Sequence, residues 1–214
     1  MPNLKDIKSR ISSVQNTKKI TKAMKMVAAA KVKKAENTVK AARPFSDELL
    51  HLFRKMLATV GEYSVAGLHV QRALDNYPEL LEKRDIKTEG LLVITSNKGL
   101  AGAYNSNIIK TAIARIRANK ERGVNTVIYA VGQKAVSAFK HAGKYFELKE
   151  GYISIANDPT ATGANIIAED IAEDFVSGHI DKIDIITTHF NNMMSYNVVS
   201  WDVLPVKVEQ ADAH

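Results

Sequence analysis

The residues of this chain with the clearest potential for chemistry lie in one short loop. Residues 96–105, Ser-Asn-Lys-Gly-Leu-Ala-Gly-Ala-Tyr-Asn, follow an apolar run and lead into a helical pattern. In doubly wound α/β folds, a loop at this position can hold phosphate on free backbone amides. This loop contains neither G-x-G-x-x-G nor G-x-x-x-x-G-K-[ST], and its Lys98 precedes the first glycine instead of following the last. The pattern therefore favours a structural turn with a helix cap over a nucleotide site.

A second candidate is a group of carboxylates on one predicted helix, which could bind a cation or form an acid–base pair. Apolar residues 166, 167, 171 and 175 recur at helical spacing on the opposite face, so we predict that the carboxylates face solvent. The six histidines show no metal-binding spacing, and the chain has no cysteine. We therefore expect no catalytic, cofactor-binding or metal site. The carboxylates are Glu169, Asp170, Glu173 and Asp174.

Positive charge is concentrated at the N-terminus. Residues 1–43 hold 12 Lys and Arg against 2 acids, a net charge of +10, whereas residues 44–214 hold 18 against 21, a net charge of −3. A row of lysines could follow a nucleic-acid backbone, but this segment has no aromatic residue for stacking and only Arg10 and Arg43 for reading bases. We favour a solvated face or an acidic protein partner, and a nucleic-acid-binding adaptor stays as the alternative. The row comprises Lys18, Lys19, Lys22, Lys25, Lys31, Lys33 and Lys34.

These lysines belong to a long predicted helix that covers most of residues 3–57. Pro44 is expected to kink or loosen it, because proline removes a backbone donor. At ~1.5 Å per residue the helix would span roughly 80 Å, more than the diameter of a domain built from the remaining residues. Much of it must therefore project and needs a partner helix or a surrounding sleeve. Its apolar stripe comprises Leu4, Ile7, Ile11, Val14, Ile20, Met24, Ala28, Val32, Ala35, Val39 and Ala42.

The rest of the chain predicts an α/β domain. Residues 58–88 are interpreted as a connector with some helix at 70–74, residues 89–205 as a Rossmann-like, mostly parallel α/β domain, and residues 206–214 as a tail. Apolar runs predict strands at 90–95, 126–131 and 183–190, an edge strand at 144–148 or 152–155, and a last strand at 197–203 antiparallel to its predecessor. Helices are predicted at 106–122, 133–141 and 162–176.

Composition limits where such a chain is expected to work. The absence of cysteine excludes disulfides and fits a reducing compartment. No run approaches the roughly 18 apolar residues that span a bilayer, and the N-terminus lacks the apolar region of a signal peptide. We therefore expect an intracellular protein whose membrane association, if any, is peripheral.

Residues 4–31, LKDIKSRISSVQNTKKITKAMKMVAAAK, strongly resemble the N-terminal helix of the gamma subunits of F-type ATP synthases. Ala42-Arg43-Pro44-Phe45 follows at the distance typical of that family, residues 94–102 resemble its strand and D-[RK]-G-L-C-G turn, and Leu204-Pro205 resembles the close of its last strand. The resemblance covers essentially the whole chain.

The resemblance implies a non-catalytic rotor of the central stalk that binds no cofactor. In that family two antiparallel helices, one from each terminus, coil inside a ring of three alpha and three beta subunits, and the α/β domain lies near the epsilon subunit and the membrane c-ring. Rotation couples proton flow to ATP synthesis or hydrolysis, here at the cytoplasmic face of a bacterial membrane. The predicted subunit contacts, in which the lysines face an acidic loop of beta, are Leu4, Ile7, Ile11, Val14, Lys18, Lys19, Ile20, Lys22, Met24, Lys25, Val27 and Ala28.

The sequence also departs from the family pattern. Asn97 and Ala101 stand where the family usually has Asp and Cys, so a role for that carboxylate or thiol is not expected here. The second stalk helix, which the resemblance places after Leu204-Pro205, is not among the 214 residues, and we interpret the chain as a fragment or a shortened form. A small nucleotide-binding enzyme that uses the Gly99–Gly102 turn remains a further alternative.

Overall fold

The computed structural model describes residues 3–63, 80, 83–140, 145–157 and 159–206. The chain divides into two compact units, Met1–Met56 and Leu57–His214, which are treated separately. The predicted helix at 70–74 lies outside the described residues.

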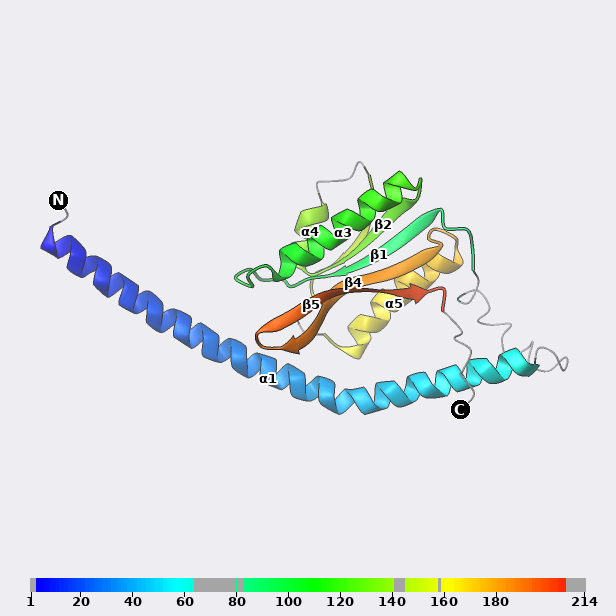
Figure 1. The fold of residues 1–214 in the computed structure, drawn as a ribbon, viewed down its shortest axis with the longest axis horizontal. Helices are drawn as coiled ribbons and strands as arrows, with labels where there is room; N and C mark the ends of the chain where they lie inside the picture. Colours follow the sequence, from blue (N-terminus) through cyan, green and yellow to red (C-terminus); the bar gives the residue numbers. More distant parts are fainter. Residues whose placement is uncertain (1–2, 64–79, 81–82, 141–144, 158, 207–214) are drawn as a thin grey trace. The chain divides into compact units, whose positions relative to one another are not determined.

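The first unit consists of helix α1, which spans Leu4–Tyr63. Asn3 and Asp6 stabilise its start, because the Asn3 carbonyl accepts the Asp6 amide at 2.9 Å and the Asp6 carboxylate accepts the Asn3 amide at 3.3 Å. The helix continues through Pro44, and Figure 1 shows it changing direction in its pale-blue middle part. The helix was predicted to end near residue 57 but continues to Tyr63, because neither Pro44 nor Gly61 ends it.

The second unit is built on a five-stranded sheet of order β3-β2-β1-β4-β5. The first four strands are parallel, and β5 pairs antiparallel with β4. From β1 the chain adds β2 and β3 on one side of the sheet and then crosses back to add β4 on the other side of β1. The strand order therefore reverses between β1 and β4, as in a doubly wound fold. Its strands are β1 (Thr88–Ile94), β2 (Asn125–Val131), β3 (Glu147–Tyr152), β4 (Lys182–Asn192) and β5 (Ser195–Leu204).

Three helices cover the two faces of this sheet (Figure 1). Helices α3 (Tyr104–Glu121) and α4 (Gln133–Phe139) bury Ile108, Ile116 and Phe139 on one face. Helix α5 (Ala161–Val176) buries Ile167, Ile171 and Phe175 on the other. The central strands β1 and β2 carry apolar side chains on both faces, and this explains why their sequences are nearly continuous apolar runs instead of alternating ones.

The predicted α/β fold is confirmed, including the antiparallel last strand. The edge strand lies between the two predicted positions, since β3 spans Glu147–Tyr152 and overlaps both. Ile166 was expected on the buried face of its helix but is exposed, because α5 turns Ile167 and Ile171 toward the sheet. Thr160 caps α5 by accepting the Gly163 amide at 3.1 Å, whereas Ala103 at the start of α3 makes no side-chain cap.

Candidate subunit interface

The most unusual surface of the molecule is the apolar stripe of α1. Ile11 is 52% exposed and Val14 is 68% exposed, although isoleucine and valine are among the residues most often buried in folded proteins. Further along, Met24, Val39 and Phe45 are exposed as well. A helix of this length draws most of its stability from packing an apolar face, so this stripe requires a cover that the described part of the first unit does not supply.

The spacing of the stripe indicates the shape of that cover. Leu4, Ile7, Ile11 and Val14 alternate steps of three and four, which is a seven-residue repeat. Because an α-helix has 3.6 residues per turn, such a repeat drifts by about 20° per heptad around a straight helix. A partner helix therefore follows this first part of the stripe, Leu4 to Val14, only by coiling around α1 in a left-handed sense.

All twelve residues predicted as subunit contacts lie on α1, and all of them are exposed. The structure places the lysines and the apolar residues on one continuous helix. Two threonines between them bond back to the helix: Thr17 Oγ1 donates to the Ser13 carbonyl at 3.0 Å, and Thr21 Oγ1 donates to the Thr17 carbonyl at 2.9 Å. These hydroxyls are therefore satisfied inside the helix.

Farther along α1, one acidic residue offsets part of the positive charge. Glu36 Oε1 is 2.8 Å from Lys40 Nζ, and its Oε2 is 3.5 Å from Lys33 Nζ. The hydrogen bond from Lys40 and the charges of both lysines hold the pKa of Glu36 below its ordinary value. Glu36 is one of the two acids in the basic segment, so an acidic partner would meet an excess of lysines there.

The loop that the sequence offered as a phosphate site leads into α3 and is also tied by hydrogen bonds to the start of α4, the helix after β2. The Gln133 amide donates to Asn97 Oδ1 at 2.7 Å, the Lys134 amide to the Ser96 carbonyl at 3.2 Å, and the Ala135 amide to Thr95 Oγ1 at 2.9 Å. These bonds between the ends of β1 and β2 favour a structural turn.

The tip of the same loop is a tight turn with an exposed leucine. Leu100 has φ of 58° and Gly102 has φ of 54°, so both adopt the left-handed conformation, which is uncommon for a leucine. The Leu100 side chain is 93% exposed. Asn105 holds the base of the turn, because its Oδ1 accepts the Ser96 amide at 3.0 Å.

Sequence reasoning missed a buried ionic cluster on β1, α3, β4 and β5. Glu89 is only 1% exposed, and Arg115 binds it with two nitrogens, Nη2 to Oε1 at 2.6 Å and Nε to Oε2 at 3.0 Å. Arg115 Nη2 also donates to Asp184 Oδ2 at 2.9 Å. Lys182 Nζ lies 2.8 Å from Asp184 Oδ1 and 2.9 Å from Asp202 Oδ1. The signal in the sequence was a charged residue at the start of two otherwise apolar strands.

The pKa values within this cluster move in opposite directions. Burial by itself would raise the pKa of Glu89, but hydrogen bonds from Arg115 and Asn119, with the charges of Arg115 and Lys182, hold it below its ordinary value. Burial together with the nearby Asp202 and Glu89 raises the pKa of Asp184 despite its ion pair with Lys182. The charges of the cluster bind one another, so it stabilises the sheet and offers no free acid or base.

One of the four carboxylates on α5 does not face solvent as predicted, whereas Glu169, Asp170 and Glu173 are exposed. Asp174 is buried, accepts the Tyr129 hydroxyl at 2.5 Å and pairs with Lys149 at 3.0 Å. Asp170 accepts the Tyr152 hydroxyl at 2.6 Å. Burial and these carboxylates raise the pKa of both tyrosines. The helical pattern could not show this, because the hydroxyl partners come from β2 and β3.

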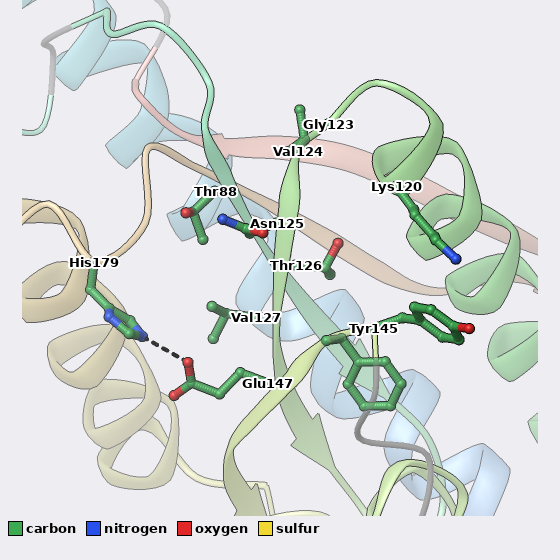
Figure 2. Close-up of a pocket in the computed structure, with 11 residues that line it drawn as sticks. Thr88, Lys120, Gly123, Val124, Asn125, Thr126, Val127, Tyr145, Glu147 and His179 are labelled. Atoms are coloured by element: carbon green, nitrogen blue, oxygen red, sulfur yellow. Dashed lines mark ion pairs between the residues drawn. The ribbon is translucent and has the colours of Figure 1, made fainter.

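A cavity of about 620 Å³ opens where β1, β2 and β3 begin (Figure 2). Ligands of doubly wound sheets bind at the carboxyl ends of the strands, which is the opposite edge. Two contacts lie in its wall: His179 Nε2 is 3.6 Å from Glu147 Oε2, and Lys120 Nζ is 3.7 Å from the centre of the Tyr145 ring. The cavity therefore lies away from the end of the sheet at which such folds bind their ligands.

The residues that the structure describes contain no group of three or more His, Cys, Asp or Glu that could hold a metal ion. Within the same ranges, no helix carries an apolar stretch of the length that a membrane crossing needs.

The fold and the exposed stripe together define a class of protein with a long helix exposing apolar residues and a small α/β unit. A family model described as ATP synthase matches residues 3–214. The chain therefore belongs to the ATP synthase family, which confirms the resemblance of residues 4–31.

The relatives are ATP synthase gamma chains. One from Gloeothece citriformis is 37% identical over 214 residues, which is 99% of this chain and 63% of the relative. One from Picosynechococcus is 40% identical over 210 residues, which is 98% of this chain and 62% of the relative. The chain thus spans a little under two thirds of the length of these relatives.

Solved structures with a similar trace include the central stalk and c-ring of the Tetrahymena thermophila mitochondrial ATP synthase. That match has 25% identity and a TM-score of 0.48, and it covers 73% of this chain and 72% of the other. A chain of the Euglena gracilis mitochondrial ATP synthase matches with 15% identity and a TM-score of 0.41, and it covers 73% of this chain and 52% of that one.

Proposed function

We propose that this chain is a gamma-type subunit of the central stalk of a rotary ATP synthase. The observation that carries the proposal is the exposed apolar stripe of α1 in a chain whose curated relatives are gamma chains. The stripe would pack against a coiled partner helix and against the inner wall of the ring of alpha and beta subunits.

The chain acts as a mechanical element without a catalytic site, and the ATP chemistry belongs to the ring subunits. This is supported by the family to which the chain belongs and by its relatives, which are ATP synthase gamma chains. The position of the α/β unit, near the epsilon subunit and the c-ring, rests on the family alone. The same holds for coupling to proton flow and for a place at the cytoplasmic face of a bacterial membrane.

The lysines of α1 supply the electrostatic part of the contact. Lys18, Lys19, Lys22 and Lys25 are exposed, and no acidic residue lies between Asp6 and Glu36. Rim charges of this kind change the association rate and the salt dependence more than the final affinity. The row that suggested nucleic-acid binding is thereby explained by an acidic loop on a protein partner.

Co-purification with ring subunits tests this proposal. The tagged 214-residue chain is co-expressed with the alpha and beta subunits of the ATP synthase of Picosynechococcus. The captured proteins are identified by mass spectrometry and assayed for ATP hydrolysis. Val14→Asp, on the stripe, should reduce capture at least tenfold, because a charge cannot be buried cheaply in an apolar contact. Asn16→Asp, on the opposite side of α1, adds the same charge and should capture normally.

Either of two results would reject the proposal. The chain could fail to retain alpha and beta subunits at any salt concentration, or it could retain them equally with Val14→Asp and Asn16→Asp. Salt-sensitive binding of DNA or RNA by the isolated chain in place of the ring would favour the nucleic-acid adaptor.

A further inference from the structure

The carboxyl ends of three parallel strands are joined by a single side chain. Asn97 follows β1 and is half-buried. Its Oδ1 accepts the amide of Gln133, the first residue of α4 after β2, at 2.7 Å. Its Nδ2 donates to the carbonyl of Ile153, the residue after β3, at 2.8 Å.

The orientation of this amide follows from its neighbours. The Gln133 backbone N–H can only donate and the Ile153 carbonyl can only accept, so the oxygen of Asn97 must face the first and the nitrogen the second. Ser96 and Thr95 also hold α4, but their bonds join the end of β1 to the end of β2 only. Asn97 alone among these three also reaches the segment after β3.

An asparagine suits this place because it combines a donor and an acceptor at the tip of a short side chain. An aspartate of the same shape could still accept from Gln133, but its ionised carboxylate has no hydrogen to give to Ile153. Two oxygens would then meet across a hydrogen-bond distance, which is repulsive unless a proton or a cation lies between them.

We infer that Asn97 is a positioning residue that locks the turn after β1 to the segments after β2 and β3 without a bound ion or a proton. The lock keeps residues 98–103 in one conformation and holds Leu100 outward. This inference rests on the geometry of the α/β unit and does not depend on the proposed function.

Isosteric substitution in the full 214-residue chain, followed by NMR, separates the two halves of the lock. In Asn97→Asp, the Ile153 carbonyl carbon resonance should move to the position of a carbonyl without that bond, while amide exchange at Gln133 stays within about twofold of the wild type. In Asn97→Ala both bonds are lost, so Gln133 exchange should rise about tenfold as well. Asn165→Asp, an exposed position on α5, adds the same charge and should change neither signal.

The inference fails if the Ile153 carbonyl resonance of Asn97→Asp matches the wild type, or if Asn165→Asp produces the same shift. It also fails if Gln133 exchange is equally fast in Asn97→Asp and Asn97→Ala, since the carboxylate should keep that acceptor. Should a variant be too unstable for NMR, its melting temperature replaces the spectrum. A lower value for Asn97→Asp than for Asn165→Asp supports the lock, and equal values overturn it.

Discussion

Glu89 shows how a single residue can be kept charged inside this protein. Glu89 is 1% exposed, and its carboxylate accepts hydrogen bonds from two nitrogens of Arg115 and from Asn119 Nδ2. Burying an ion is costly unless its hydrogen bonds are complete, and removing one partner of such a pair leaves the other charge unpaired. The intact cluster therefore contributes more to the free energy of unfolding than any one of its contacts would alone.

Glu89→Gln should destabilise the α/β unit by about 3 kcal/mol at pH 7, because Arg115 and Lys182 would lose a negative partner. The folded pKa of Glu89 lies below its ordinary value of 4.5, so the charge stabilises the fold above about pH 4.5 and this contribution is lost as the pH falls through the folded pKa. The difference in urea stability between wild type and variant should therefore shrink on acidification.

Glu121→Gln is the matched control, since Glu121 is exposed at the end of α3. It should change the unfolding free energy by less than about 0.5 kcal/mol. A Glu89→Gln variant as stable as this control at pH 7 would show that the ionic cluster does not stabilise the sheet.

Gly132 is a second residue whose type is dictated by its surroundings. Its φ is 92°, and a Cβ built there would lie 2.4 Å from the Thr95 carbonyl oxygen. Gly102 also has a positive φ of 54°, but a Cβ there would meet nothing within 4 Å. The two glycines share the conformational requirement and differ in space.

Gly132→Ala should therefore lower the unfolding free energy by more than about 3 kcal/mol, whereas Gly102→Ala should cost only about 1–2 kcal/mol for the left-handed backbone. Urea denaturation of both variants measures the difference. Equal losses would mean that the ends of β1 and β2 can separate at little cost, contrary to the contacts described here.

At the scale of elements, the sequence predicted most of the α/β unit because the central strands β1 and β2 are apolar runs between helical patterns. The predictions failed where a contact comes from another element. β3 is an edge strand with the charged residues Glu147, Lys149 and Glu150, so its pattern is weak. The burial of Asp174 on α5 was missed because its hydroxyl partner, Tyr129, belongs to a strand distant in sequence.

Helix α1 illustrates a breaker that bends an element without ending it. Pro44 removes one backbone donor from a helix of 60 residues, yet the helix continues to Tyr63. Its length, roughly 90 Å at about 1.5 Å per residue, gives many hydrogen bonds on both sides of the defect. One lost bond therefore changes the direction of the helix and leaves its existence intact.

Pro44→Ala should strengthen α1 locally, because it restores a donor and removes a clash, together worth up to about 3 kcal/mol in a helix interior. Amide exchange over residues 40–48 should slow about tenfold, and helical circular dichroism should rise slightly. Ser46→Ala, two residues after Pro44, leaves the proline in place and should keep amide exchange within about twofold of the wild type. Unchanged exchange in Pro44→Ala would show that Pro44 does not weaken the helix.

At the scale of the whole molecule, residues 4–31 indicate the family of the chain. The structure of one chain does not identify which subunits contact α1. The stripe of α1 is visible as a repeat, but what covers it belongs to other helices, and a residue pattern in one chain does not identify them. The α/β unit buries an apolar core on both faces of its sheet, whereas Ile11, Val14 and their neighbours are exposed. The two units thus differ in what they need from partners.

The central claim, that α1 is a stalk helix enclosed by ring subunits, is tested most directly by hydrogen exchange of the 214-residue chain with and without alpha and beta subunits. We predict slower exchange over residues 4–42 in the complex, by about tenfold or more, and unchanged exchange in β1, β2 and β4. Protection confined to the α/β unit, with α1 exchanging as in the free chain, would contradict the account.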